Sequence, residues 1–229
     1  AYATRRKPAS TCTQHLGRRL QCFSRRTQRL TVRQPFERED STYLVDKRKS
    51  QGYSVVQMAF LQYYTYPLMV PDRFKRVSVD DIYFWRDVDR YIAYANDAGI
   101  VPAVGLTFSS GMDPYTLAEW QTTWRYFIAR YGAYGMSPLI CGEYNYQNDA
   151  NRVAKVLALG QFIKDTDPYH RAMTVHPWWY QGDGHQAWSQ AWYDIISFQG
   201  AHEVGLIPTV STYYNAYNGS PARPVLETE

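Results

Sequence analysis

Residues 139–145, with the sequence LICGEYN, decide the fold, because they place a carboxylate at the end of a short apolar run. A run of this length and composition predicts a buried β-strand, with Glu143 at its carboxyl end. A carboxylate in that position is ion-paired, protonated or functional. A structural glutamate in an ion pair is the alternative, but the position at a strand end favours a functional residue.

The same pattern recurs along the chain, with apolar runs separated by segments of helical periodicity. The predicted strands are 54–60, 100–108, 139–145, 172–178, 195–201 and 225–229. Helices are predicted near 37–50, 79–98, 115–131, 150–165 and, more weakly, 186–192, and a last connecting segment covers 208–217. This alternation predicts a parallel α/β fold. No glycine-rich phosphate-binding motif follows a strand, which argues against a dinucleotide-binding sheet.

Polar side chains gather at the carboxyl ends of these strands. In a (β/α)8 barrel all of those ends open on the same face, where barrel enzymes keep their active sites. A buried strand rarely accommodates a carboxylate or an imidazole without a partner, so the repeated pattern predicts a shared polar site. Its members are Gln57, Thr107, Glu143, Asn145, His176, Gln199, His202 and Glu229.

Two carboxylates stand out among these residues. Glu227 and Glu229 lie on the same side of the last predicted strand, and Glu229 is nearer its carboxyl end. Glycoside hydrolysis needs two carboxyl groups, one to protonate the departing oxygen and one to attack the anomeric carbon or activate water. We therefore predict Glu143 and Glu229 as the catalytic pair, against the alternative that Glu229 is a solvated chain end. The residues predicted to bind substrate are Gln57, Asn145, His176, Trp178, Gln199 and Glu227.

The predicted binding residues also have structural interpretations. His176 is either a partner for a sugar hydroxyl or a core histidine, and Trp178 is either a platform for a sugar ring or a packing residue in a loop. The histidines follow no metal-binding spacing, and the chain has no Gly-x-Ser-x-Gly motif. We therefore expect no metal, no cofactor and no serine-hydrolase mechanism.

The basic charge of the chain belongs to one end. Residues 1–36 hold eight Arg and one Lys and no acidic residue, so a net charge of +4 leaves −5 for residues 37–229. We expect neither nucleic acid nor a membrane as a partner, because the acidic body offers no phosphate-binding surface and no apolar run could span a bilayer. Residues 1–36 fit a disordered basic tail, a transit peptide or a misread coding sequence, and we favour the last.

Five stretches together resemble the apiosidase-like glycoside hydrolases, the DUF4038 family. They are QGYSVVQMAF (51–60), YFWRDVDRYIAYANDAGIVPAVGLTF (83–108), YGMSPLICGEYN (134–145), DPYHRAMTVHPWW (167–179) and ARPVLETE (222–229). The resemblance implies a TIM barrel with an acid/base carboxylate after strand four and a nucleophile after strand seven. With the first strand missing, Glu143 and Glu229 take these positions. It also implies an oligosaccharide or polysaccharide substrate and a secreted or periplasmic location, although no signal peptide is visible.

The sequence also departs from the family pattern. The first and eighth strands have no counterpart, so we expect residues 37–229 to form an incomplete TIM barrel that can be inactive as a fragment. Gly142 stands where many related barrels carry Asn before the acid/base residue. The main hypothesis is an O-glycosidase. The alternatives are a carbohydrate-binding barrel without turnover and a nucleic-acid binder that acts through the basic residues 1–36.

Overall fold

The computed structural model of the chain describes residues 38–59, 82–178, 186–199 and 210–228. The basic segment 1–36 and two of the predicted site residues, His202 and Glu229, lie outside these ranges. None of the helices in the described ranges is long and apolar enough to cross a membrane.

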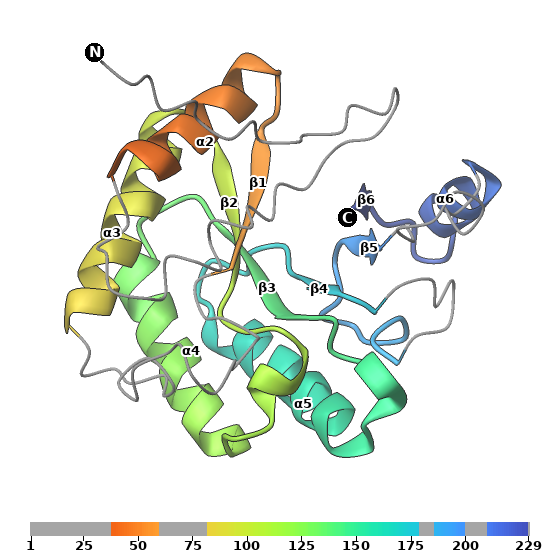
Figure 1. The fold of residues 1–229 in the computed structure, drawn as a ribbon. Helices are drawn as coiled ribbons and strands as arrows, with labels where there is room; N and C mark the ends of the chain where they lie inside the picture. The colour runs from red at the N-terminus through yellow and green to blue at the C-terminus, as the bar shows by residue number, and fades with distance from the viewer. Residues whose placement is uncertain (1–37, 60–81, 179–185, 200–209, 229) are drawn as a thin grey trace, which may run out of the picture.

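Four parallel strands form the main sheet, in the order β1-β2-β3-β4. They are β1 (Val55–Ala59), β2 (Val101–Gly105), β3 (Ser137–Gly142) and β4 (Thr174–His176). Two further strands, β5 (Ile196–Phe198) and β6 (Val225–Glu227), pair in parallel with each other, and β5 lies next to β4. All six predicted strands are therefore present, in the sequential parallel order of part of a barrel (Figure 1).

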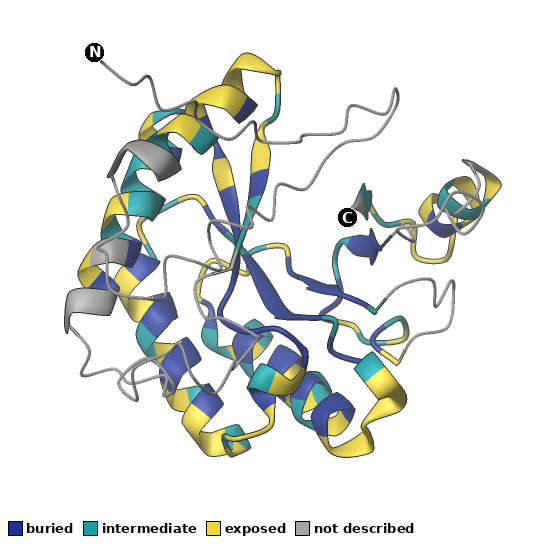
Figure 2. Cartoon of the chain, in the orientation of Figure 1, coloured by how far each residue is buried: buried dark blue, intermediate teal, exposed yellow. Residues whose placement is uncertain are grey.

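Four helices cover the outer side of the main sheet (Figure 1). They are α2 (Arg38–Ser50), α3 (Ile82–Asp97), α4 (Leu117–Tyr131) and α5 (Ala150–Thr166), and a shorter helix, α6 (Val210–Tyr217), precedes β6. The sides of α3, α4 and α5 that face the sheet are buried, whereas their outer sides are exposed (Figure 2). This two-layer arrangement leaves the carboxyl ends of the strands for the loops that carry the polar residues.

Helix α4 shows how the sequence specifies this layer. Thr116 caps its first turn, because the Thr116 hydroxyl accepts from the Glu119 N–H at 3.2 Å and the Glu119 carboxylate accepts from the Thr116 N–H at 2.8 Å. Along one face, buried side chains recur every three or four residues and form the centre of the hydrophobic core. They are Trp120, Trp124, Phe127, Ile128 and Tyr131.

The predicted helix over residues 186–192 is wrong, because this segment forms turns. Distant side chains bind its backbone instead. Tyr144 accepts from the Ala187 N–H at 3.0 Å, and Arg223 donates to the Trp188 carbonyl at 2.8 Å. So short a segment gains too few helical hydrogen bonds to compete with these tertiary contacts.

Candidate active site

The carboxyl ends of β2, β3 and β4 lie side by side. The Gly142 N–H donates to the Thr107 carbonyl at 3.1 Å, and Phe108 forms a parallel bridge with Gly142. On the other side, Gly142 is the register partner of His176. Neighbouring strand ends therefore carry three of the predicted positions. Thr107 and Glu143 come shortly after β2 and β3, and His176 is the last residue of β4.

Glu143 lies at the point where β3 ends and the chain turns. The predicted strand over 139–145 stops at Gly142, and Glu143 adopts a left-handed backbone conformation with φ of 45°. The turn is closed by the Tyr146 N–H, which donates to the Glu143 carbonyl at 3.0 Å. A non-glycine residue in this region costs about 1–3 kcal/mol and persists only where the surrounding structure holds it in place.

The glycine before Glu143 is required by space. A Cβ atom at Gly142 would lie 2.0 Å from Cε1 of the Phe108 ring, and its φ is not among the positive values. Phe108 is buried, and its ring centroid lies 5.6 Å from that of His176. The ring of Phe108 thus occupies the volume that the side chain of Asn would need, which accounts for the departure at Gly142.

Gln199 connects β5 to Glu143. It directly follows β5, and its Nε2 donates to Oε1 of Glu143 at 3.5 Å. Next along the sheet, the N–H and hydroxyl of Thr228 both donate to the Phe198 carbonyl at 2.8 Å. The end of β6 is therefore bound to the end of β5, whose next residue contacts Glu143. Glu227 belongs to β6 as the register partner of Phe198.

Asn145, Tyr146 and Trp178 form a second group beside Glu143. Oδ1 of the buried Asn145 accepts from the Trp178 N–H at 2.6 Å. The half-buried rings of Tyr146 and Trp178 meet edge to face, with their centroids 4.6 Å apart. The contact made by Asn145 gives it a structural role in holding the loop after β4 against the loop after β3.

Gln57 lies further from the strand ends than the sequence suggested. It is half-buried in the middle of β1, where it is the register partner of Ala103, and β1 continues to Ala59. The structure thus brings together Glu143, Asn145, His176, Trp178 and Gln199, and it places Gln57 deeper along the first strand of the sheet.

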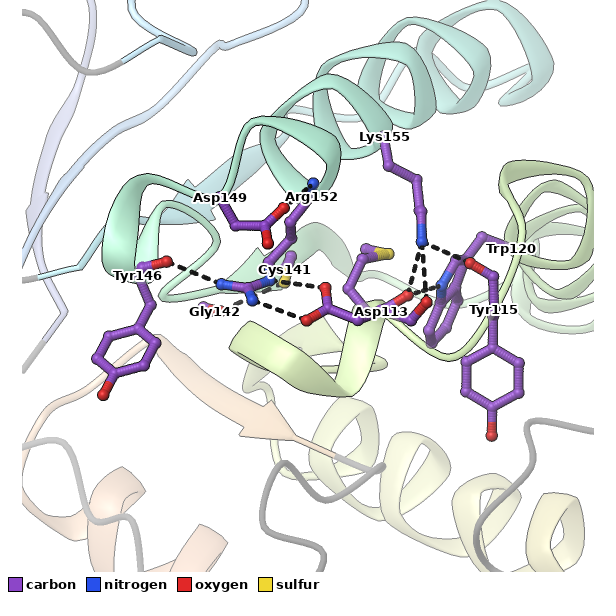
Figure 3. Close-up of polar contacts among 10 residues, drawn as sticks. Asp113, Tyr115, Trp120, Cys141, Gly142, Tyr146, Asp149, Arg152 and Lys155 are labelled. Atoms are coloured by element: carbon purple, nitrogen blue, oxygen red, sulfur yellow. Dashed lines mark hydrogen bonds and ion pairs between the residues drawn. The ribbon is translucent and has the colours of Figure 1, made fainter.

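A buried arginine lies beneath these loops. Arg152, in the first turn of α5, donates to both carboxylate oxygens of Asp113 at 2.8 and 2.7 Å and to the Tyr146 carbonyl at 2.9 Å (Figure 3). This ion pair could not be predicted from the sequence, because Asp113 lies 39 residues earlier, in the loop after β2. The one available signal was a charged residue beside the apolar positions Val153 and Val156 of a predicted helix.

Burial favours the neutral form of two side chains close to Glu143 in the sequence. Complete burial raises the pKa of the Cys141 thiol well above its ordinary value, so this cysteine is neutral and is no nucleophile. Burial likewise raises the pKa of the Tyr144 phenol. Within the described ranges, no group of three or more His, Cys, Asp or Glu residues could hold a metal ion.

Several solved glycoside hydrolases have a similar fold. A family 5 glycoside hydrolase from Bacteroides vulgatus is 21% identical, with a TM-score of 0.65 over 87% of this chain and 46% of that chain. A second glycoside hydrolase is 19% identical, with a TM-score of 0.63 over 84% of this chain and 48% of that chain. A broad-specificity GH5-4 endoglucanase from Clostridium longisporum is 11% identical, with a TM-score of 0.51 over 80% of this chain and 64% of that chain.

These likenesses show the fold, and the chain spans about half the length of the first two structures. The comparison with curated protein sequences found no match. The model of one family, described as the apiosidase-like catalytic domain, matches residues 31–229, which is most of the chain. The chain, with its parallel α/β architecture, therefore belongs to the apiosidase-like glycoside hydrolases.

Proposed function

We propose that this domain cleaves O-glycosidic bonds in a plant or microbial polysaccharide, with Glu143 as general acid/base and Glu229 as nucleophile. The observation on which the proposal depends most is the placement of Glu143. It follows β3 in a left-handed conformation, beside the ends of β2 and β4 and in contact with Gln199 after β5. A half-buried carboxyl group held in this way can give a proton to a departing glycosidic oxygen and later take one from water.

The role of Glu229 is supported by its place in the sequence. It follows Thr228, which is bound to the Phe198 carbonyl immediately before Gln199. In the sequence, Glu143 directly follows β3 and Glu229 comes two residues after β6. A retaining glycosidase uses carboxyl groups from two different strands, about 5–5.5 Å apart. Attack by Glu229 on the anomeric carbon would break the bond to the leaving oxygen, which takes the proton of Glu143. Water activated by Glu143 would then release the sugar.

The surroundings of Glu143 suit a sugar ring. Gln199 and His176 are amide and imidazole groups of the kind that hydrogen-bond hydroxyls, and Gln57 and Glu227 are further polar candidates on the outer strands. Trp178, with Tyr146 against it, offers an aromatic surface for the apolar face of a sugar. In this proposal Asn145, which is fully buried, acts by holding the Trp178 backbone.

The test is sugar release from plant polysaccharides and from a panel of 4-nitrophenyl glycosides, including an apiofuranoside because of the family's name. The 229-residue chain is assayed beside a version extended by the sequence encoded on either side. On polysaccharide, Glu143→Gln and Glu229→Gln should each lower kcat by about 100-fold or more, whereas the loss for Glu143→Gln should be smaller on 4-nitrophenyl glycosides, whose leaving group needs little protonation. Asp97→Asn, an exposed acid at the end of α3, is the matched control and should leave kcat unchanged.

Each outcome bears on the proposal. Full activity in either glutamine variant would refute the assignment of that carboxylate. Binding of an oligosaccharide by calorimetry without release of product would instead select a carbohydrate-binding barrel that lacks turnover.

A further inference from the structure

We infer that Arg152 is a positioning residue for Glu143, so this inference rests on the proposed role of that carboxylate. Arg152 lies in the first turn of α5, and its side chain is only 4% exposed. Its guanidinium joins the loops that follow two neighbouring strands. Nε and Nη2 bind the carboxylate of Asp113 after β2, and Nη1 binds the carbonyl of Tyr146 after β3.

The hydrogen bond to Tyr146 reaches Glu143 through one short turn. The N–H of Tyr146 donates to the Glu143 carbonyl at 3.0 Å, and the carbonyl of the same residue accepts from Arg152 at 2.9 Å. Glu143 has a φ of 45°, a conformation that persists only where neighbouring contacts fix it. Arg152 supplies such a contact at the far end of the turn.

The partners of Arg152 are themselves held firmly. Lys155, on the next turn of α5, donates to the carbonyls of Met112 and Tyr115 at 3.1 and 2.5 Å. These carbonyls flank Asp113, so α5 fixes the position of the Asp113 loop independently of Arg152 (Figure 3). Asp149 caps the same helix by accepting from the Arg152 N–H at 2.8 Å. The guanidinium therefore binds Tyr146 from a helix that is itself fixed to the Asp113 loop through Lys155.

The charge of Arg152 matters for this role. The hydrogen bonds with Asp113 are the main reason that the pKa of Arg152 is raised, so it remains a cation. A buried cation paired in a two-point fork is fixed in orientation, which lysine cannot reproduce because it lacks the planar fork. In Figure 3 the Tyr146 ring points away from Arg152, while its carbonyl points toward it. One guanidinium thus holds the backbone that carries both Glu143 and the ring packed on Trp178.

Arg171 provides a matched control. It is also a mostly buried arginine that binds an aspartate, Asp167, at 2.6 Å and a backbone carbonyl, that of Gly132, at 2.5 Å. It precedes β4 and so lies at the amino end of the sheet, away from Glu143. Arg152→Gln and Arg171→Gln each remove a guanidinium that binds an aspartate and a backbone carbonyl, and they do so at opposite ends of the strands.

The first measurement is hydrogen exchange in the full chain, which does not depend on activity. Arg152→Gln should speed exchange of the Tyr146 and Asn148 amides by about tenfold, the factor expected for loss of a hydrogen bond to a charged group. Arg171→Gln should leave these two amides unchanged. Asp113→Asn, whose side chain is 40% exposed, should give a smaller effect in the same direction and decides the matter if Arg152→Gln does not fold.

The second measurement separates positioning of an acid from general loss of structure. Arg152→Gln should lower kcat/KM by about tenfold on phenyl glycosides, which need protonation of the leaving group, and by less than about threefold on 4-nitrophenyl glycosides. Unchanged exchange at Tyr146, or an equal loss on both glycosides, would overturn the inference. If the unaltered protein releases no sugar, the proposed function fails, and the exchange result still decides whether Arg152 holds the turn.

Discussion

Replacing Gly142 with alanine should destabilise the protein through the Phe108 ring. The added Cβ would lie 2.0, 2.1 and 2.4 Å from three atoms of that ring, whereas ordinary contacts lie beyond 3.4 Å. The ring must therefore move by more than an ångström. It is buried and packs against His176, which is fully buried too, so it has little room to do so.

Overpacking of this kind costs about 1–3 kcal/mol, and the severity of the overlap places the expected loss near 3 kcal/mol. With an m-value of about 3 kcal/mol/M, the urea midpoint would fall by about 1 M. The assay is urea denaturation of the 229-residue chain followed by tryptophan fluorescence. Gly135→Ala, whose nearest neighbour would be the Asn96 side chain at 3.3 Å, is a milder comparison on the loop before β3.

A double-mutant cycle identifies the cause. Phe108→Leu removes the ring, so Gly142→Ala in that background should cost less than about 1 kcal/mol, a coupling of about 2 kcal/mol. An equal cost in both backgrounds would refute the reasoning, as would a loss below about 0.5 kcal/mol for Gly142→Ala alone.

Three further predictions concern packing of the core, the stability of the protein at acidic pH and substrate binding by Trp178. Gly160→Ala should lower the free energy of unfolding, measured in urea, by about 1–3 kcal/mol, although alanine has the better helix propensity. The reason is that the new Cβ would lie 2.3 Å from the buried Trp192 ring. A gain in stability would contradict this. The hydrogen bond from Arg130 is the main cause that lowers the pKa of Asp89. The ionised Asp89 carboxylate therefore stabilises the folded protein above pH about 4, and this contribution is lost as pH falls through the lowered pKa. Denaturation as a function of pH should therefore show Asp89→Asn converging on the unaltered protein in acid, and a constant difference would be inconsistent. Trp178→Ala should raise KM on polysaccharide about tenfold with little change in kcat, and an unchanged KM would remove Trp178 from the binding surface.

Much of the fold follows from local pattern. The apolar run before Glu143 predicted β3 because a buried parallel strand needs such a run, and helical periodicity over residues 79–98 predicted α3. Residues 186–192 were mispredicted as a helix because their backbone partners, Tyr144 and Arg223, are distant in the sequence. Periodicity does not reveal contacts of that kind.

The relative placement of the candidate site residues was predicted in part. Position at a strand end was enough to predict that Glu143, His176 and Gln199 lie near one another, since parallel strands bring their carboxyl ends to one edge. The left-handed turn at Glu143 was not predictable, because such turns usually carry glycine, and here the glycine stands one residue earlier for reasons of space. Arg152 was missed because its partners lie on two other segments.

The central claim is that Glu143 supplies the proton to the leaving group, and one measurement tests it most directly. The kcat/KM of Glu143→Gln, which reports only the step in which the leaving group departs, is compared with that of the unaltered protein on phenyl and on 4-nitrophenyl glycosides of the same sugar. If Glu143 is the acid, the loss should be about 100-fold or more on the phenyl glycoside and at least about tenfold smaller on the 4-nitrophenyl glycoside. Equal losses on the two substrates, or no loss on either, would contradict the assignment.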